Sequence, residues 1–228
     1  MLINRQFYNL LFPPKRIILR KPRVNYETNN IIFKNYIIYG FQGVGKTSTV
    51  NYLAGKAIQK YGRNNVNAVV SEDGDLELLM HYGLQPKLVN ILFSDNITLR
   101  RIDRSTLMDY FKIRHLFYKR FERTNGYILS IMALHRFHSI PVELRTTIDG
   151  IIFKDSSLNP YDRSIIKKFV GQEYLQLLDN LHRAREKKPS LKRLAIFVSK
   201  DLSGIISIPL ARNNYLKEIN SYLCLIKR

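Results

Sequence analysis

A chain of 228 residues with 45% apolar side chains is long enough for one sizeable packed domain and too short for two ordinary ones. Its single cysteine excludes an intramolecular disulfide, and no apolar stretch approaches the ~18–20 residues of a membrane helix, so we expect a cytoplasmic protein without a membrane partner. The 37 Lys and Arg residues against 18 Asp and Glu residues give a net charge of +19, which favours a polyanionic partner, above all nucleic acid.

The sequence divides into a basic N-terminal extension, residues 1–34, and a domain from Asn35 to Arg228. Prolines interrupt the extension, and its apolar run RIILR, residues 16–20, is a candidate short strand. We therefore expect the regular fold to begin near Asn35.

From Asn35 onward, apolar strand patterns alternate with amphipathic helix patterns. Helices are predicted at 47–61, 76–84, 105–123 and 161–185. Strands are predicted at 36–39, 67–70, 88–95, 126–134 and 149–154, followed by a terminal hairpin within 194–211. This alternation predicts an α/β fold with a mostly parallel, doubly wound sheet flanked by helices and ending in a C-terminal β-hairpin.

The stretch GFQGVGKT, residues 40–47, matches the phosphate-binding pattern G-x-x-x-x-G-K-[ST] in full. It lies between a short strand and an amphipathic helix, which is the context that the pattern requires. Glycines let the backbone N–H groups turn toward phosphate oxygens, and the helix presents its positive end to the same anion. Lys46 is expected to reach the β- and γ-phosphates and Thr47 to ligate Mg²⁺. The residues expected to bind nucleotide are Gly40, Gln42, Gly43, Val44, Gly45, Lys46, Thr47 and Ser48.

Asp95 ends the most apolar strand after this loop and is the candidate second ligand of Mg²⁺; the alternative is an acid that caps the next turn. The following residue is Asn96, whose amide cannot accept a proton from water. Glu72 and Asp73 end the preceding strand, and adjacent parallel strands end at the same edge. We expect Glu72 to act as the base while Asn96 orients the water, as Gln does in some GTPases; a solvated acidic turn is the alternative for Glu72.

The stretch YILSIMALHRFHSIPVELRTTIDGIIFK, residues 127–154, resembles P-loop ATPases of the FtsK/HerA superfamily, especially small versions from archaeal viruses and plasmids. It is also similar to the DnaA-like ATPases of fusiform archaeal viruses. In that pattern a polar sensor, often Gln, and an Arg follow the strand after the metal-binding Asp. His135 and Arg136 stand at these positions, and a proline turn, Arg145 and another strand follow.

The resemblance covers residues 35–154 and implies a RecA-like core, ATP and Mg²⁺ as cofactors, a homo-oligomer such as a hexameric ring, and DNA as partner. It makes His135 a γ-phosphate sensor, and Arg136 and Arg145 fingers that act across a subunit boundary. The alternative for His135 is a side chain that hydrogen-bonds only to backbone groups. The alternative for Arg136 and Arg145 is a plain surface role.

The leading hypothesis is an ATPase that acts on double-stranded DNA as a packaging, partition or replication motor. The alternatives are a nucleotide-gated DNA-binding module with little hydrolysis, an AAA+ replication initiator, and a nucleotide or small-molecule kinase. Three basic stretches are candidate DNA contacts: residues 20–23, the cluster Arg100, Arg101 and Arg104, and residues 185–193.

Overall fold

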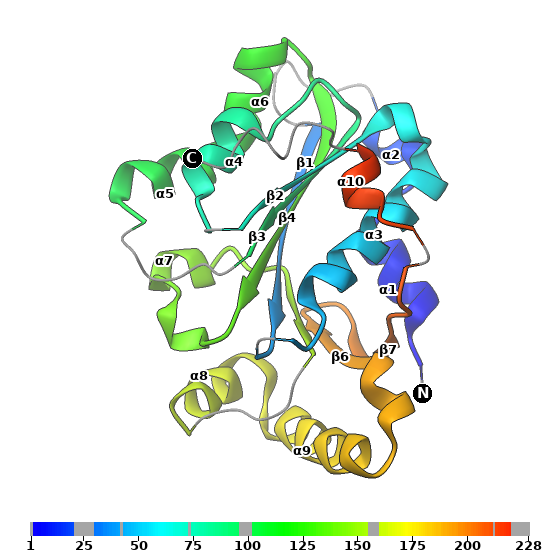
Figure 1. The fold of residues 1–228 in the computed structure, drawn as a ribbon. Helices are drawn as coiled ribbons and strands as arrows, with labels where there is room; N and C mark the ends of the chain where they lie inside the picture. Colours follow the sequence, from blue (N-terminus) through cyan, green and yellow to red (C-terminus); the bar gives the residue numbers. More distant parts are fainter. Residues whose placement is uncertain are drawn as a thin grey trace.

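The computed structural model describes residues 2–20, 30–41, 43–72, 74–95, 102–154, 160–211 and 213–219. Within them, seven strands form one sheet in the order β2-β3-β4-β1-β5-β6-β7 (Figure 1). The strands are β1 (Asn30–Tyr39), β2 (Val66–Ser71), β3 (Val89–Ser94), β4 (Asn125–Leu134), β5 (Gly150–Phe153), β6 (Leu194–Ser199) and β7 (Ser203–Ser207).

The first five strands are parallel to one another, and β6 runs antiparallel to both of its neighbours, β5 and β7. Strand β1 is central, with β4 on one side and β5 on the other, so β4 separates β1 from β3. The expected α/β fold, a mostly parallel sheet flanked by helices with a C-terminal hairpin, is confirmed. Because parallel strands end at the same edge, the segments that follow β1 to β5 all emerge together.

Helices cover both faces of the sheet (Figure 1). One face carries α1 (Asn4–Leu11), α2 (Lys15–Ile18), α3 (Lys46–Tyr61) and α10 (Tyr215–Ile219). The other face carries α4 (Leu76–Tyr82), α5 (Arg104–Phe111), α6 (Ile113–Phe121) and α7 (Val142–Arg145). Helices α8 (Pro160–Val170) and α9 (Gln172–Lys187) lie beyond the carboxyl ends of the central strands. Short 3-10 turns, η1 (Arg63–Asn65), η2 (Phe137–Ser139) and η3 (Pro189–Arg193), connect these elements.

The two faces of the sheet form two hydrophobic cores. Successive residues of β1 alternate between them: Tyr36 and Ile38 pack with α1 and α3, whereas Ile37 and Tyr39 pack on the opposite side. Burial on both faces explains why the central strands read as continuous apolar runs rather than alternating ones. Among the described residues, every helix is too short or too polar to cross a lipid bilayer.

The expectation of a strand in residues 16–20 is wrong, because Lys15–Ile18 form helix α2. Pro14 stands at the position before this helix with φ −56°, a value that its ring fixes and that suits a helix start. Ile18 is fully buried in the same core as Phe7 and Leu11 of α1. Helices α1 and α2 are therefore packed against the sheet.

Two helices that were expected to be continuous are each divided. Residues 105–123 contain α5 and α6, and the break falls at Lys112, whose N–H donates to both Met108 O and Asp109 O in a tightened turn. Residues 161–185 contain α8 and α9, and the break falls at Gly171. Its φ of +83° is a left-handed conformation that favours glycine and ends a helix.

Candidate nucleotide site at the carboxyl edge of the sheet

The loop of residues 40–45 joins the end of β1 to the start of α3. The Gly40 N–H donates to Leu134 O at 3.0 Å, so the loop leaves β1 beside the end of β4. Gly43 and Gly45 have φ values of +81° and +83°, left-handed conformations that non-glycine residues rarely adopt. Gly45 caps α3 without a side-chain hydrogen bond. The first N–H groups of a 16-residue helix are therefore directed at the loop without a side-chain cap, which suits an anion.

Lys46 is the first residue of α3, and its side chain folds back across the loop. Its Nζ donates to Gly40 O and Phe41 O at 3.0 Å each and lies 3.5 and 3.4 Å from the two ring nitrogens of His135. Burial, and then the nearby Lys46 ammonium, lower the pKa of His135, although Asp95 opposes this shift. A neutral imidazole therefore faces the ammonium near neutral pH.

Thr47 and Asp95 come together from α3 and the end of β3. The Thr47 hydroxyl donates to Asp95 Oδ2 at 3.1 Å, and the Asp95 N–H donates to Ser71 O at 2.8 Å. A hydroxyl and a carboxylate are ligands that suit Mg²⁺ beside a phosphate. In the described ranges, no group of three or more His, Cys, Asp and Glu side chains is arranged so that it could hold a metal ion. Magnesium held here would need Thr47, Asp95, water and ligand oxygens rather than a cage of protein carboxylates.

Glu72 follows β2, and the register that pairs Ser71 with Ser94 places its backbone beside that of Asp95. Gln42, Asp73 and Asn96 lie outside the described residues. Val44 is partly buried, and Ser48, on the first turn of α3, is exposed. The structure thus brings Lys46, Thr47, Asp95 and His135 into one cluster, with Glu72 on the outer flank of β3.

The two arginines expected to act across a subunit boundary differ in their surroundings. Arg136 is exposed directly after His135. Arg145 is partly buried and donates from Nε to Ile140 O and from Nη2 to His138 O, both at 3.0 Å. These bonds fix the turn between β4 and α7 within the chain.

Asp162 of α8 links two segments beside this cluster, a contact that the sequence analysis did not predict. Its buried carboxylate accepts hydrogen bonds from the Tyr39 hydroxyl at 3.0 Å and from the N–H and Nδ1 of His138 at 2.9 Å each. It thereby joins the last residue of β1, which precedes the loop, to the segment after His135. No periodicity or spacing in the sequence links an acid on a helix to a tyrosine 123 residues away.

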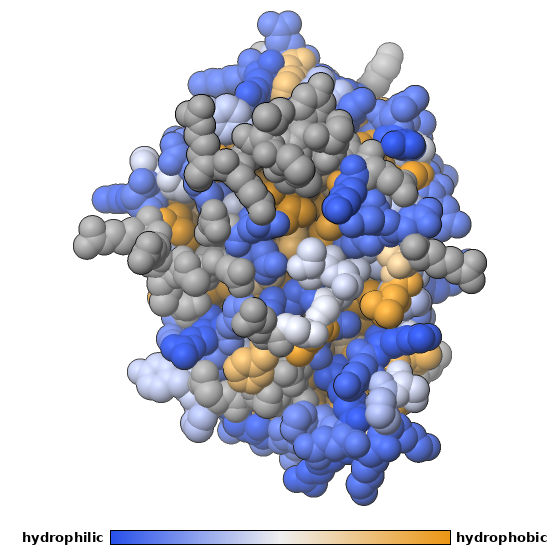
Figure 2. Space-filling model, viewed as in Figure 1, coloured by the Kyte–Doolittle hydropathy of each residue, from blue (hydrophilic) through white to orange (hydrophobic). Residues whose placement is uncertain are grey.

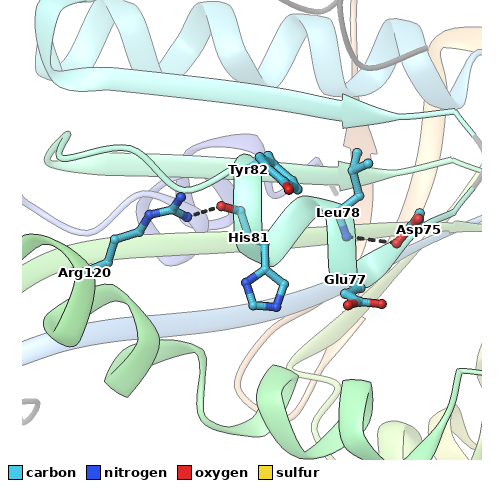
Figure 3. A pocket seen from close by; sticks show the side chains of 6 residues that line it. All are labelled: Asp75, Glu77, Leu78, His81, Tyr82 and Arg120. Atoms are coloured by element: carbon cyan, nitrogen blue, oxygen red, sulfur yellow. Dashed lines mark hydrogen bonds between the residues drawn. The ribbon is translucent and has the colours of Figure 1, made fainter. Parts of the chain in front are cut away.

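A pocket of about 320 Å³ lies along α4, on the face of the sheet opposite α3 (Figure 3). Its wall is fixed by Arg120 of α6, whose Nη1 donates to His81 O, and by Asp75, which accepts from Leu78 N at 2.9 Å to cap α4. Its carboxylate lining consists of Asp75 and the exposed Glu77. This pocket contains none of the residues of the loop that follows β1.

No family model matches the chain, and a comparison with curated proteins finds no match either. Solved structures do match. The chain is similar to the genome packaging NTPase B204 from Sulfolobus turreted icosahedral virus 2, with 10% identity and a TM-score of 0.51 for the AMPPCP complex. For the sulfate complex the values are 12% and 0.50. Each match covers 78% of this chain and 98% of the other.

A third solved structure, the N-terminal domain of zonular occludens toxin from Neisseria meningitidis, matches 54% of this chain and 76% of that domain. Its identity is 11% and its TM-score 0.36. At these identities the matches to B204 establish the fold. The chain has the RecA-like P-loop NTPase fold, and the expected fold class is confirmed.

The first prediction concerns Asp162. Burial raises the pKa of its carboxyl, but hydrogen bonds from His138, Phe137 and Tyr39 outweigh burial and hold the pKa below its usual range. Because the pKa of Asp162 is lower in the folded state than in the unfolded state, its ionisation stabilises the fold at any pH above the unfolded-state pKa of ~4. This stabilisation is lost as the pH falls through the folded-state pKa. We expect Asp162→Asn to lower the free energy of unfolding by about 1.5–3 kcal/mol at pH 7 and to flatten its decline below pH ~4.

Urea denaturation between pH 2 and 7 measures both effects. Asp179→Asn is the matched control, because Asp179 pairs with Arg163 at the surface, where an ion pair contributes about 0–1 kcal/mol. Equal losses in the two variants would contradict the buried role of Asp162.

Proposed function

We propose that this chain binds ATP with Mg²⁺ at residues 40–48 and hydrolyses it, and that turnover is coupled to DNA. The observation that carries the proposal is the cluster of Lys46, Thr47, Asp95 and His135 at the start of α3. Phosphate chemistry needs a cation, backbone N–H donors and metal-binding oxygens in one place. Lys46 would supply the cation, the loop and the first turn of α3 the N–H donors, and Thr47 and Asp95 the oxygens. The RecA-like fold also supports the proposed nucleotide binding.

In this proposal Lys46 exchanges its bonds to Gly40 O and Phe41 O for the β- and γ-phosphate oxygens. The N–H groups of the loop and of the first turn of α3 hold the remaining oxygens. Thr47 and Asp95 hold Mg²⁺, which would neutralise charge on the phosphates. His135, kept neutral beside Lys46, is placed to hydrogen-bond the γ-phosphate as a sensor.

Hydrolysis also needs a group that prepares the attacking water. Glu72 is the proposed base, because the β2–β3 register carries it to the same sheet edge as Asp95. Asn96, next to Asp95, is proposed to orient the water through its amide. Arg136 and Arg145 are proposed as fingers that reach a γ-phosphate across the boundary between copies of a homo-oligomer, such as a hexameric ring. Arg145 would have to exchange its bonds to Ile140 O and His138 O to do so.

Double-stranded DNA is the proposed partner because the chain carries a net charge of +19. The surface over α8 and α9 is largely hydrophilic (Figure 2). In the stretch 185–193, Lys187, Lys188, Lys192 and Arg193 are exposed. Arg185 differs, since both its Nη groups donate to backbone carbonyls. B204 is named a genome packaging NTPase, and packaging, partition and replication motors all fit this proposal.

A second candidate is a nucleotide-gated DNA-binding module with little turnover. The observation that favours it is Asn96, which stands where many ATPases carry a catalytic acid. Comparison of ATP binding with ATP hydrolysis distinguishes the two, because the module binds the nucleotide as tightly and releases phosphate only slowly.

Lys46→Ala tests the binding site. We expect ATP affinity to fall more than about 100-fold, about 2.7 kcal/mol, because the variant loses the phosphate-binding cation. Isothermal titration calorimetry measures the affinity, and a thermal melt checks that the fold persists. Lys119→Ala, which removes an exposed lysine of α6, is the control and should bind ATP normally. Unchanged affinity in a folded Lys46→Ala protein would rule the site out.

Glu72→Gln tests the base. Single-turnover phosphate release should slow by about 10²–10⁴-fold with ATP affinity unchanged, because general-base assistance is lost while the phosphate contacts remain. Glu77→Gln changes another exposed acid, on α4, and should turn over like the original protein. A large loss from Asn96→Ala with none from Glu72→Gln would remove Glu72 from the mechanism and leave Asn96 as the residue that orients water.

The DNA contact should depend steeply on salt. Log affinity for duplex DNA is expected to fall by about 0.9 per phosphate neutralised for each tenfold rise in salt. Replacing Lys187, Lys188 and Arg193 with Gln should flatten this slope, as measured by fluorescence anisotropy. The matched control replaces Lys112, Arg114 and Lys119, exposed on the α5–α6 side, with Gln. Equal slopes for both triple variants would place the DNA surface elsewhere.

A further inference from the structure

A second pocket shares two residues with the proposed phosphate-binding loop. It has a volume of about 430 Å³ and is lined on one side by Gly43 and Val44. Lys154, directly after β5, lines it as well. The remaining walls come from His182, Arg185 and Glu186 of α9 and from Lys192 of η3. Pockets of this size hold small ligands.

Lys154 lies beside the start of the loop because its N–H donates to Tyr39 O at 2.8 Å, which continues the pairing of β5 with β1. The residue is only 7% exposed. Within the described part of the chain, its Nζ has no hydrogen bond or ion pair. Burial, and then the neighbouring Arg185, lower the pKa of Lys154 to about 8. A mostly charged, buried ammonium therefore faces the pocket.

Arg185 is held rigidly at the pocket wall. Its Nη1 donates to Lys154 O at 2.7 Å, and its Nη2 donates to Leu194 O. These bonds bring a second cation against the segment that carries Lys154. Burial deprives the Lys154 ammonium of hydration, and the neighbouring Arg185 repels it. An anionic ligand would offset both costs.

We propose that this pocket extends the phosphate-binding loop and that Lys154 is an additional cation contacting the phosphate chain of the bound nucleotide. The inference rests on the proposed nucleotide binding. It gives a role in that site to Lys154, to which neither the G-x-x-x-x-G-K-[ST] pattern nor the resemblance assigns one. Gly43 and Val44 form both the loop and the pocket wall, so an anion in the loop and the ammonium of Lys154 share one continuous space.

Burial argues for a phosphate chain rather than a DNA backbone as the anion. The phosphates of a duplex reach exposed cations such as Lys187 and Lys188. Lys154 is reached only by a ligand that enters the pocket, which a flexible chain of linked phosphates can do.

Lys154→Met tests this inference, since it keeps the length of the side chain and removes its charge. Calorimetry at pH 7 uses two probes, ATP and inorganic tripolyphosphate, which has no nucleoside. We expect affinity for both probes to fall at least tenfold. The control Lys119→Met should stay within twofold, because it removes an equal charge on α6. Lys154→Gln is a second neutral variant, should the methionine variant unfold.

A pH series supplies an independent readout. A bound phosphate raises the pKa of Lys154, so the original protein should lose affinity as the pH rises from 7 to 9, and the neutral variants should lose less. His182, Arg185 and Glu186 of α9 and Lys192 of η3 line the same pocket, but they are the same in every variant. The difference between the two profiles therefore belongs to Lys154.

The outcomes separate the two proposals. If the original protein binds ATP and both neutral Lys154 variants bind both probes as Lys119→Met does, the inference is overturned and the proposed function stands. A loss with ATP but none with tripolyphosphate overturns it too, because Lys154 would then contact the nucleoside. If the original protein binds neither probe, the proposed function and the inference are both overturned.

Discussion

The parallel register of β3, β4, β1 and β5 is the constraint on which the site depends. Four segments, distant in sequence, end at one edge because Tyr39 pairs with both Leu134 and Phe153 while β3 pairs with β4. The hydroxyl of Thr47 therefore reaches Asp95, 48 residues away, at 3.1 Å. A sheet in which β4 did not separate β1 from β3 would not place His135 beside Lys46. The strand order therefore determines which side chains meet at the carboxyl edge of the sheet.

Two lysines near this edge, Lys46 and Lys154, could contact an anion, but the surroundings of their ammonium groups differ. Lys46 has backbone carbonyls and His135 around its ammonium, so a ligand must replace existing contacts. Lys154 is buried without such contacts in the described part of the chain, so a ligand supplies the missing partner. In the proposed site, the first arrangement holds Lys46 against the loop in the free protein, and the second would strengthen ligand binding. Asp162 adds rigidity by tying Tyr39 to His138.

The sequence predicted the features that are encoded within a few consecutive residues, but not the contacts between segments that are distant in sequence. The loop was predictable because its glycines and Lys46 encode the geometry within eight residues, and the apolar strands were predictable because both faces of the sheet are buried. The helix in residues 15–18 was missed, since a short apolar run is compatible with strand or helix until packing decides. Asp162 and Lys154 were missed because their surroundings come from segments that meet only in the folded chain. The roles of Lys46, Thr47, Asp95 and His135 are proposals, as are those of Glu72, Asn96, Arg136 and Arg145.

The proposed DNA-dependent motor is tested most sharply by the steady-state rate of ATP hydrolysis, with and without duplex DNA, for the unmodified chain and for Lys46→Ala. We expect Mg²⁺-dependent hydrolysis that rises several-fold with DNA, falls again at high salt, and is absent from Lys46→Ala under every condition. A rate no higher than that of Lys46→Ala, with ATP still bound, would contradict the motor and leave a nucleotide-gated DNA-binding module.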